Sequence, residues 1–504
     1  YKKLKQELIT SFNHKFYSKS DTEVILASYY YYGSSCVKNF EGMFSFVIYD
    51  NLKNELFMAR DNFGIKPLYY YYDEKKIIFS SELNQFKFFD IFKKQFNNIQ
   101  IINEFLVHGY IVGKKTIFNK INKLLPGQII KVYLDKKKIQ IKKIEKDKNN
   151  YNFSKNNYSL ENLDNLLEET IKLWTTADVD LSLFLSGGVD SSLLAYYLKK
   201  INKRIDTYSY FYDSDDKFFN ESDLVKKIKD KLKIKNYAIQ ISKNNLSDKF
   251  ISLTRHLNEP INDLNSLTFM MLCEGFRKIT KKKVVFTGDG SDEIFGGYDR
   301  YLKFSKKKSL SKKLIANNYL SVDRLKNYCK SDYHLSTTRY RLSDNTKFKN
   351  RLNQILHIDR KVFLPQYLNR IDKIGMKYGI EFRPPFLGNK IVEYSKNLPA
   401  NHIFKRRYDQ IYGKFILRRL SYKKLNLKKI SWPNKKIPFG APSKDILNQN
   451  MKELFYDTMN SKAKISQYFD IKGILKMYNE QQNFDIDHSN LLTRLLSLEI
   501  LMRN

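Results

Sequence analysis

The stretch Leu185–Ser192, LSGGVDSS, has the composition of a phosphate-binding loop but contains no lysine. It lies between a short apolar segment and a helix-like segment, and the start of a helix offers backbone N–H groups and a positive dipole to an anion. Gly187 and Gly188 permit a tight bend and a close approach of the backbone. Asp190 would repel a phosphate unless a cation lay between them, and Mg²⁺ prefers a carboxylate together with phosphate oxygens. The loop therefore predicts the binding of magnesium-bound phosphate.

Three hydroxyl groups in this loop, on Ser186, Ser191 and Ser192, are further candidate phosphate donors. A P-loop would instead need the pattern G-x-x-x-x-G-K-[ST], whose lysine contacts the outer phosphates. The segment Gly109–Thr116 has neither that spacing nor a strand–helix frame. We therefore expect the loop to hold pyrophosphate that leaves when an acid attacks the α-phosphate of ATP. The SGGVDSS segment resembles the signature of the PP-loop ATP-pyrophosphatases.

A second acidic segment, residues 284–301, carries Asp289, Asp292 and Glu293 among glycines. Clustered carboxylates repel one another, so they indicate a shared cation or a role in proton transfer. Because Asp190 and Asp292 follow different predicted strands, the carboxyl edge of a parallel sheet could bring both to one Mg²⁺.

Attack at phosphorus also requires a positive group near the charge that develops there. The segment YGKFILRR, residues 412–419, offers Lys414 and Arg418. Spacing alone does not distinguish them from the other basic residues, because the chain contains 90 lysines and arginines.

Strands and helices alternate from Ser159 onward, which predicts a doubly wound parallel sheet covered by helices. A helical stripe of leucines follows Ser159, a candidate helix cap. Residues 1–145 are expected to be mostly strands, residues 147–158 form a polar, asparagine-rich linker, and the chain beyond residue 300 is expected to be helical. The predicted strands of the second part are 181–185, 205–212, 237–241 and 284–287, and its next helices are 191–200 and 221–232.

The net charge of +37 would suit a nucleic-acid binder, but the lysines are scattered along the chain. We favour a general lysine-rich composition and do not expect a nucleic-acid partner. Cys36, Cys273 and Cys329 fit neither a zinc site nor a disulfide framework, which is typical of a reduced cytoplasmic protein. No apolar run reaches the length of about 18 residues that indicates a membrane span, so no membrane association is expected.

The motifs along the whole chain resemble those of the glutamine-hydrolysing asparagine synthetases, and they occur in the same order. In the second part these motifs are LSGGVDSS, GDGSDEIFGGY, MKYGIEFRPPFL (376–387) and KFILR (414–418). In the first part they are SDTEVIL (20–26), FEGMFSFVIYD (40–50), ARDNFGIKPLYY (59–70), FSSEL (79–83) and TIFNKINKLLPGQ (116–128).

The resemblance implies a mixed α/β and α+β protein of two domains. Residues 1–146 would be a partial N-terminal-nucleophile glutaminase β-sandwich, residues 147–158 a linker, and residues 159–504 a PP-loop synthetase domain with a helical C-terminal part. It implies that glutamine supplies ammonia, that ATP adenylates the side-chain carboxylate of aspartate, and that ammonia replaces AMP to give asparagine. ATP is a co-substrate, Mg²⁺ the metal and a homodimer a candidate assembly.

The resemblance also assigns roles to single residues. Asp190 and Asp292 match the Mg²⁺ ligands, and Lys414 matches the lysine that stabilises charge at phosphorus. Asp289 matches an acidic position associated with formation of the intermediate, and Asp21 matches the group that holds the α-amine of glutamine. Tyr298 and Arg383 are candidate acceptor-site residues. The positions that match contacts to ATP or pyrophosphate are Leu185, Ser186, Gly187, Gly188, Asp190, Ser191, Ser192, Tyr210, Thr287 and Gly288.

Three features depart from the family pattern. The sequence starts just after the position of the family's NGEIYN motif, so the nucleophilic cysteine of the glutaminase is expected from a segment upstream of Tyr1. Gly388 stands where the family has aspartate, and residues 434–442 differ from the family's wording. The departures at Gly388 and at residues 434–442 leave open which carboxylic acid is the acceptor.

Alternatives to asparagine synthesis therefore remain. The same adenylation could act on another carboxylate, such as a sugar or peptidoglycan acid of the cell surface. A PP-loop enzyme that modifies tRNA would show a concentrated basic face and binding that weakens with salt. A catalytically inactive interaction protein would show eroded loops, whereas these loops are intact.

Overall fold

A computed structural model describes most of the chain. The described residues are 1–73, 75–89, 99–144, 158–201, 204–212, 222–305, 324–330, 351–396, 398–407, 410–433, 440–483 and 486–503. Apart from Tyr158, the expected linker lies outside these residues, and the domain boundaries at 146 and 159 stay a prediction.

The chain begins with helices, so the expectation of mostly strands is wrong for its first 39 residues. Helix α1 spans Lys2–Phe12, α2 spans Asp21–Tyr32, and a 3₁₀ turn, η1, spans Gly33–Asn39. The end of α2 is a run of tyrosines, which favour strands in isolation. Ser20 nevertheless caps α2 by accepting a hydrogen bond from the N–H of Thr22, and the apolar side of α2 packs in a buried cluster with α1.

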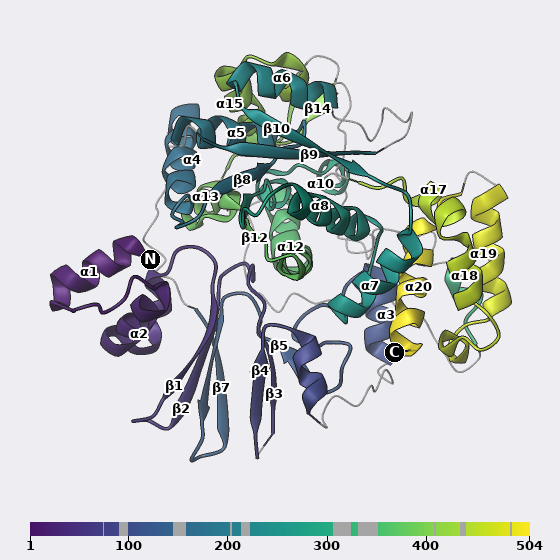
Figure 1. Cartoon of the computed structure of the whole chain (residues 1–504), viewed down its shortest axis with the longest axis horizontal. Helices are drawn as coiled ribbons and strands as arrows, with labels where there is room; N and C mark the ends of the chain where they lie inside the picture. The colour runs from purple at the N-terminus through teal and green to yellow at the C-terminus, as the bar shows by residue number, and fades with distance from the viewer. Residues whose placement is uncertain are drawn as a thin grey trace.

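Two antiparallel sheets follow and pack against each other in the lower half of Figure 1. One has the order β1-β2-β6-β7, and the other has the order β4-β3-β5. Side chains alternate across β2: Phe57 packs toward α1 and α2, whereas Met58 packs with Tyr70 of the second sheet. The bounds are β1 Ser45–Asp50, β2 Glu55–Arg60, β3 Tyr69–Tyr72, β4 Ile77–Ser80, η2 Leu83–Phe88, α3 Ile99–His108, β5 Ile121–Lys123, β6 Gln128–Tyr133 and β7 Lys138–Lys143.

The second part contains the predicted parallel sheet, with the order β10-β9-β8-β11-β12. All four neighbouring pairs are parallel. The strands are β8 Leu181–Phe184, β9 Asp206–Tyr212, β10 Lys235–Ile241, β11 Val284–Phe286 and β12 Glu381–Arg383. The chain runs outward from β8 to β10 and then returns to place β11 on the other side of β8. This reversal is a topological switch point, where the carboxyl ends of parallel strands form a ligand crevice.

Helices cover both faces of this sheet. Val284 and Phe286 pack with α4 (Leu160–Trp174) and α5 (Val189–Ile201), whereas Val285 between them packs with α7 (Leu246–Leu257) and α8 (Asn265–Ile279). Ser159 caps α4 as expected, because its hydroxyl accepts a hydrogen bond from the N–H of Asn162 at 3.0 Å.

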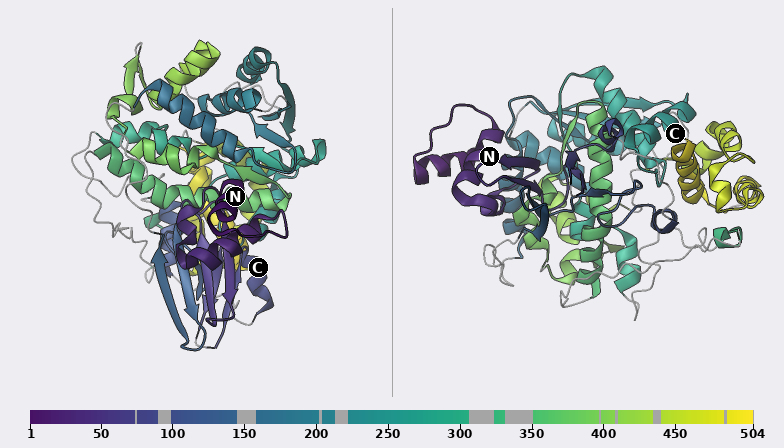
Figure 2. Two further views of the ribbon diagram at one scale, coloured as in Figure 1. Left: turned by 90° about the vertical axis from the view of Figure 1, so that its left-hand side faces the viewer. Right: turned by 90° about the horizontal axis from the view of Figure 1, so that it is seen from below.

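The remaining elements are mainly helical. They are α6 Ser222–Leu232, α9 Ser291–Phe295, α10 Asp299–Ser305, α12 Arg351–Lys377, η7 Pro385–Leu387, α13 Asn389–Lys396, α14 Ala400–Ile403, β13 Lys405–Arg407, β14 Gln410–Tyr412, α15 Phe415–Leu425, α16 Lys428–Ser431, α17 Ser443–Asp445, η8 Ile446–Asn450, α18 Lys452–Thr458, η9 Lys464–Gln467, α19 Ile471–Asn483 and α20 Ser489–Arg503. Among the described helices, none is both long and apolar enough to cross a lipid bilayer. The C-terminal helices and α1–α2 lie at opposite ends of the molecule (Figures 1 and 2).

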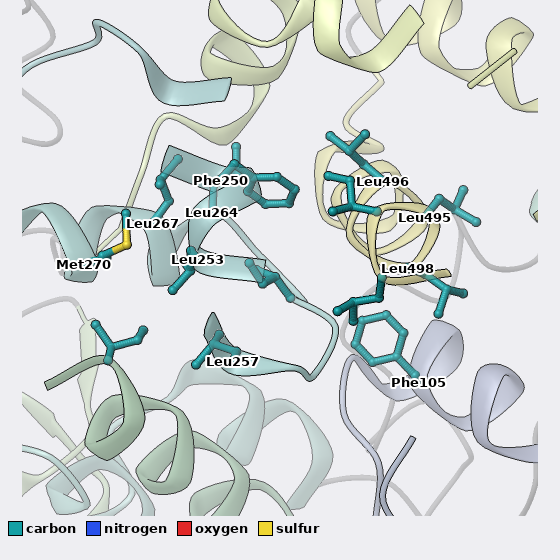
Figure 3. Close-up of a cluster of buried hydrophobic side chains, with 14 of the residues drawn as sticks. Phe105, Phe250, Leu253, Leu257, Leu264, Leu267, Met270, Leu495, Leu496 and Leu498 are labelled. Atoms are coloured by element: carbon teal, nitrogen blue, oxygen red, sulfur yellow. The ribbon is translucent and has the colours of Figure 1, made fainter. Parts of the chain in front are cut away.

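Helix α20 joins the two parts of the chain. Its leucines pack with Phe105 of α3 on one side and with Phe250 and Leu253 of α7 on the other (Figure 3). The buried guanidinium of Arg494 donates a hydrogen bond to the carbonyl of Leu106, near the C-terminal end of α3. The apolar contact and this cap hold the N-terminal sheets against the parallel-sheet part.

Replacement of Leu495 by alanine should lower the free energy of unfolding by about 2–5 kcal/mol, because Leu495 is fully buried and a cavity would remain. Denaturant titration measures this change. Leu173→Ala is the matched control: Leu173 is 50% exposed on α4, and its loss should cost no more than about 0.5 kcal/mol. Equal costs for the two variants would contradict the packing described for α20.

Candidate active site

The switch point brings the two predicted loops into direct contact. The loop after β8 leads into α5, and the loop after β11 leads into α9. At Gly288 an added Cβ would lie 3.0 Å from the Cβ of Asp190, so the loops are nearly as close as their backbones allow. The hydroxyl of Ser291 donates a hydrogen bond of 2.8 Å to Asp190 Oδ1. Residues 101 positions apart thus form one surface at the carboxyl edge of the sheet.

Lys414 lies between the two carboxylates that were predicted to share a cation. Its Nζ is 2.6 Å from Asp190 Oδ2 and 2.8 Å from Asp292 Oδ1. The lysine side chain is only 2% exposed, whereas the two aspartates are partly exposed. The three side chains therefore converge on one point, with the lysine approaching from the protein interior and the carboxylates in contact with solvent.

The backbone around Lys414 is unusual for a residue with a side chain. Lys414 follows the β13–β14 hairpin and precedes α15 with a φ of 53°, in the left-handed region. A non-glycine residue there costs on the order of 1 kcal/mol, so the surrounding structure must hold it in place. Gly413 contributes to this, because a Cβ on it would lie 2.3 Å from the carbonyl oxygen of Gly296.

Gly297 creates the space through which Lys414 reaches Asp292. A Cβ at position 297 would lie 1.6 Å from Asp292 Oδ1 and 2.3 Å from Lys414 Cε. The N–H of Gly297 donates a hydrogen bond of 2.8 Å to the carbonyl oxygen of Asp292, which closes α9. The pair of glycines in GDGSDEIFGGY thus has a steric role in assembling the charged cluster.

Opposing electrostatic effects act on Lys414. Burial works to lower the pKa of its ammonium group, but the carboxylates of Asp190 and Asp292 outweigh burial and raise this pKa above its ordinary value. Lys414 is consequently a cation at neutral pH. A buried cation with two carboxylates is the type of preorganised charge that stabilises an anionic transition state.

The same two carboxylates fit the requirements of Mg²⁺. This ion is usually held by one or two protein carboxylates, with substrate phosphates and water as its other ligands. Within the part of the chain that the structure describes, no group of three or more His, Cys, Asp or Glu side chains is arranged to hold a metal. Asp190 and Asp292 would therefore bind Mg²⁺ together with phosphate oxygens rather than as a complete protein cage.

The serines of the phosphate loop contact the loop itself. The hydroxyl of Ser191 donates to the carbonyl of Ser186 at 2.7 Å, and that of Ser192 donates to the carbonyl of Gly188 at 2.6 Å. The hydroxyls of Ser186 and Ser191 lie 3.0 Å apart. These bonds fix the bend before α5, whose first-turn N–H groups point along the helix axis toward the crevice.

The acidic loop directs its carboxylates to different partners. Asp292 faces Lys414, Asp289 accepts a hydrogen bond of 2.9 Å from the hydroxyl of Tyr367, and Glu293 accepts one of 2.8 Å from Tyr298. Burial raises the pKa of Asp289 above its ordinary value, and burial together with Asp292 raises the pKa of Glu293 to about 7. Tyr298, a candidate acceptor residue, thus lies beside the acidic loop.

The remaining predicted residues occupy different surroundings. Tyr210 on β9 accepts a hydrogen bond from the N–H of Gly440, and Arg418 donates to the carbonyl of Gly413 just before Lys414. The N–H of Thr287 bonds to the carbonyl of Arg383 across β11 and β12. The side chain of Arg383 turns to the C-terminal end of α4, where it donates to the carbonyls of Trp174 and Thr176, so the described contacts do not bring it to the acidic loop.

Asp21 belongs to a second cavity, of about 450 Å³. Residues of α2 and β1 line one side of this cavity, and residues of α12 and β12 line the other. Lys66 and Asp372, both in its wall, form an ion pair of 2.7 Å that joins the N-terminal part to α12. A carboxylate in the first turn of α2 is suited to hold an ammonium group of a small molecule in this space.

The departure at Gly388 has a local structural explanation. A Cβ at this position would lie 2.4 Å from the methyl carbon of Thr170, so an aspartate there would require the Thr170 side chain to move. The carboxylate of Glu41 instead accepts a hydrogen bond of 2.9 Å from the N–H of Asn389, at the start of α13. Glu41 thus places a carboxylate at the start of α13, where an aspartate at position 388 could also cap the helix. Of the segment 434–442, only residues 440–442 lie among the described residues.

Sequence reasoning missed four residues that take part in the contacts described above. Ser291 and Gly297 lie inside the quoted motif GDGSDEIFGGY, and the glycine doublet was the available signal for the latter. Glu41 lies inside FEGMFSFVIYD, but no pattern links it to position 389. Tyr367 lies in a helix and comes from outside every motif, so only the folded chain reveals it.

The substitution Gly297→Ala should reduce any activity of the cluster at least about 100-fold, because the new methyl group would displace Asp292 or Lys414 from its partner. Gly113→Ala is the control: nothing lies within 4 Å of the added Cβ, so any cost of this variant comes from its backbone φ of 76° and not from a clash. Activity is read as release of pyrophosphate from ATP, and folding as thermal unfolding. A G297A variant as active as G113A would contradict the steric role of this glycine.

Comparisons with known proteins agree with this geometry. Residues 162–503 match the family described as asparagine synthase, and residues 1–144 match the glutamine amidotransferase domain. The first matched range contains the parallel sheet. The second contains the two antiparallel sheets of the N-terminal part.

Several named proteins are similar to this chain. A Methanocaldococcus jannaschii protein whose name places it among the glutamine-hydrolysing asparagine synthetases is 31% identical over 302 residues, which cover 59% of this chain and 57% of that protein. Asparagine synthetase [glutamine-hydrolyzing] 3 of Bacillus subtilis is 27% identical over 77% of this chain and 66% of its own length. The amidase chry2 of Gibberella zeae is 25% identical over 81% of this chain and 70% of its own length. This chain thus spans less than two thirds of the first two relatives. Because the family match covers more than half of the sequence, the chain belongs to the asparagine synthase family.

Proposed function

We propose that the chain is part of an ATP-dependent ligase that uses glutamine as its nitrogen source and converts aspartate to asparagine. The observation that carries this proposal is the position of Lys414 between Asp190 and Asp292 at the switch point. A lysine-free phosphate loop next to two carboxylates and a buried cation suits attack at the α-phosphate of ATP, with pyrophosphate as the leaving group.

Each part of the crevice has a role in this reaction. The turn before α5 would hold the pyrophosphate portion of ATP against the first N–H groups of the helix. Asp190 and Asp292 would hold Mg²⁺, which when bound neutralises phosphate charge. Lys414 would meet the negative charge that develops at phosphorus, and its buried position means that little reorganisation is needed when that charge forms. Asp289 would lie beside the acceptor acid.

The first part would supply the ammonia. The Asp21 cavity suits glutamine in size and charge, and its far wall is formed by α12 and β12 of the second part. The amidotransferase match over residues 1–144 supports this assignment. The nucleophile for glutamine hydrolysis, the cytoplasmic location and the homodimer expected from the resemblance stay predictions.

A second candidate function is the same adenylation of another carboxylic acid. The amidase name of a Gibberella zeae relative that is 25% identical favours it. The adenylation cluster would be unchanged in this case, because Asp190, Asp292 and Lys414 act on ATP and not on the acid.

An acid-dependence assay tests both candidates. The 504-residue chain is given ATP, Mg²⁺, ammonium chloride and one acid at a time: aspartate, glutamate, or a sugar acid such as glucuronate. Pyrophosphate release that requires aspartate, with asparagine formed in equal amount, is the expected result. Release that requires another acid would replace asparagine synthesis by the second candidate, and release with no acid at all would reject the adenylating function.

Asp292→Asn should reduce acid-dependent pyrophosphate release at least about 100-fold, because a Mg²⁺ ligand and a partner of Lys414 are lost together. The Mg²⁺ concentration for half-maximal activity should rise in any residual activity. Asp299→Asn, at an exposed position in the first turn of α10, is the control and should match the unmodified chain. Near-normal activity of D292N would reject the metal assignment.

Lys414→Ala should lower kcat for pyrophosphate release by about 100-fold or more, the usual effect of removing one preorganised charge from a transition state. Lys405→Ala, in the adjoining hairpin and exposed, serves as the control. An unchanged kcat in K414A would remove Lys414 from the reaction.

A further inference from the structure

Asp289 differs from its two neighbouring aspartates in what contacts it. Asp190 and Asp292 share the ammonium of Lys414 as a charged partner, whereas the carboxylate of Asp289 accepts a hydrogen bond from a neutral phenol, that of Tyr367, at 2.9 Å. A hydrogen bond from a phenol orients a carboxylate but leaves its negative charge in place. Asp289 is thus an oriented carboxyl group beside the cluster.

Tyr367 is itself held in place by the long helix α12. Its ring stacks on that of Phe363, one turn earlier, with centroids 6.1 Å apart and an interplanar angle of 13°. The guanidinium of Arg300 lies 5.3 Å from the other ring of this stack and pairs with Asp359, one turn earlier again. One face of α12 therefore carries Asp359, Phe363 and Tyr367, and this face lies toward the acidic segment 284–301.

The phenol is a donor throughout the working pH range. Burial and the nearby carboxylate of Asp289 raise the pKa of Tyr367 well above its ordinary value. The hydrogen of the hydroxyl consequently stays on Tyr367 and points to Asp289 Oδ1.

We propose that Tyr367 is a positioning residue for the adenylation reaction: its hydroxyl holds the Asp289 carboxylate in the orientation in which it meets the acceptor acid. This inference rests on the proposed function, and it adds a residue that lies outside every recognised motif. Tyr367 itself need not touch the substrate, because it acts through Asp289. A purely structural role would instead be limited to packing of the ring against Phe363, and that packing does not need the hydroxyl.

The substitution Tyr367→Phe separates these roles, because it removes the hydroxyl and keeps the ring. Tyr197→Phe is the matched control: the Tyr197 hydroxyl donates to a carboxylate, Asp164 Oδ1, at 2.6 Å in the contact between α4 and α5. Both variants lose one hydrogen bond from a phenol to an aspartate. They are measured in the 504-residue chain by acid-dependent pyrophosphate release and by thermal unfolding.

We expect kcat of Y367F to fall about 10- to 100-fold, the range for loss of a group that orients an active-site ligand. The KM for ATP should not change, because the groups proposed to hold the ATP phosphates are the first N–H groups of α5 and the carboxylates of Asp190 and Asp292, and none of them contacts Tyr367 in the bonds described. Y197F should keep the kcat of the unmodified chain. The double variant Y367F/D289N should be no less active than D289N, because the two residues act as a unit.

The inference is overturned if Y367F keeps the kcat of Y197F, or if the losses of Y367F and D289N multiply in the double variant. A loss of kcat that only follows a loss of folded protein in the unfolding curve would likewise assign Tyr367 to packing. Failure of the proposed function has a different signature, since the unmodified chain would then release no pyrophosphate with any acid, whatever residue occupies position 367.

Discussion

The buried ammonium of Lys414 between Asp190 and Asp292 is the interaction on which the rest of this crevice depends. Three segments that are remote in the sequence must meet within hydrogen-bonding distance for it to form. The switch point of the parallel sheet provides two of them, and the β13–β14 hairpin provides the third. The interaction also gives a role to two local features, the left-handed backbone of Lys414 and the glycine at 297, where a Cβ would meet both Asp292 and the lysine side chain.

Charge balance distinguishes the roles of the acidic groups in the crevice. Two carboxylates share one buried cation, while Asp289 and Glu293 are bonded to phenols and keep raised pKa values. The cluster thus combines two carboxylates whose charge is partly balanced by one lysine with neighbouring carboxyl groups that, within the described residues, have no lysine partner of this kind and bond to phenols instead. The separation comes from which segment supplies each partner: the segment between β14 and α15 supplies the lysine, and α12 supplies Tyr367.

Much of this arrangement could be predicted from the sequence, because the motifs lie at strand ends and strand ends meet at one edge. The parallel sheet and the Ser159 cap follow directly from periodicity and residue type. Sequence patterns did not predict the helical start of the chain, where a serine cap and tertiary packing override the strand preference of tyrosine. They also could not predict the roles of Tyr367 and Glu41. Tyr367 bonds to Asp289, 78 residues away, and Glu41 bonds to Asn389, 348 residues away, and no local pattern links such distant residues.

Helix α12 takes part in both the Lys414 crevice and the Asp21 cavity. Tyr367 faces the acidic loop, and Asp372, five residues later, closes the wall of the Asp21 cavity through Lys66. Five residues of helix span about 7.5 Å, which is less than two turns. The two halves of the protein therefore do not behave as interchangeable modules during evolution. A recombination event that imported a foreign N-terminal half would have to bring side chains that fit this one helix. We therefore expect the two halves to be inherited together.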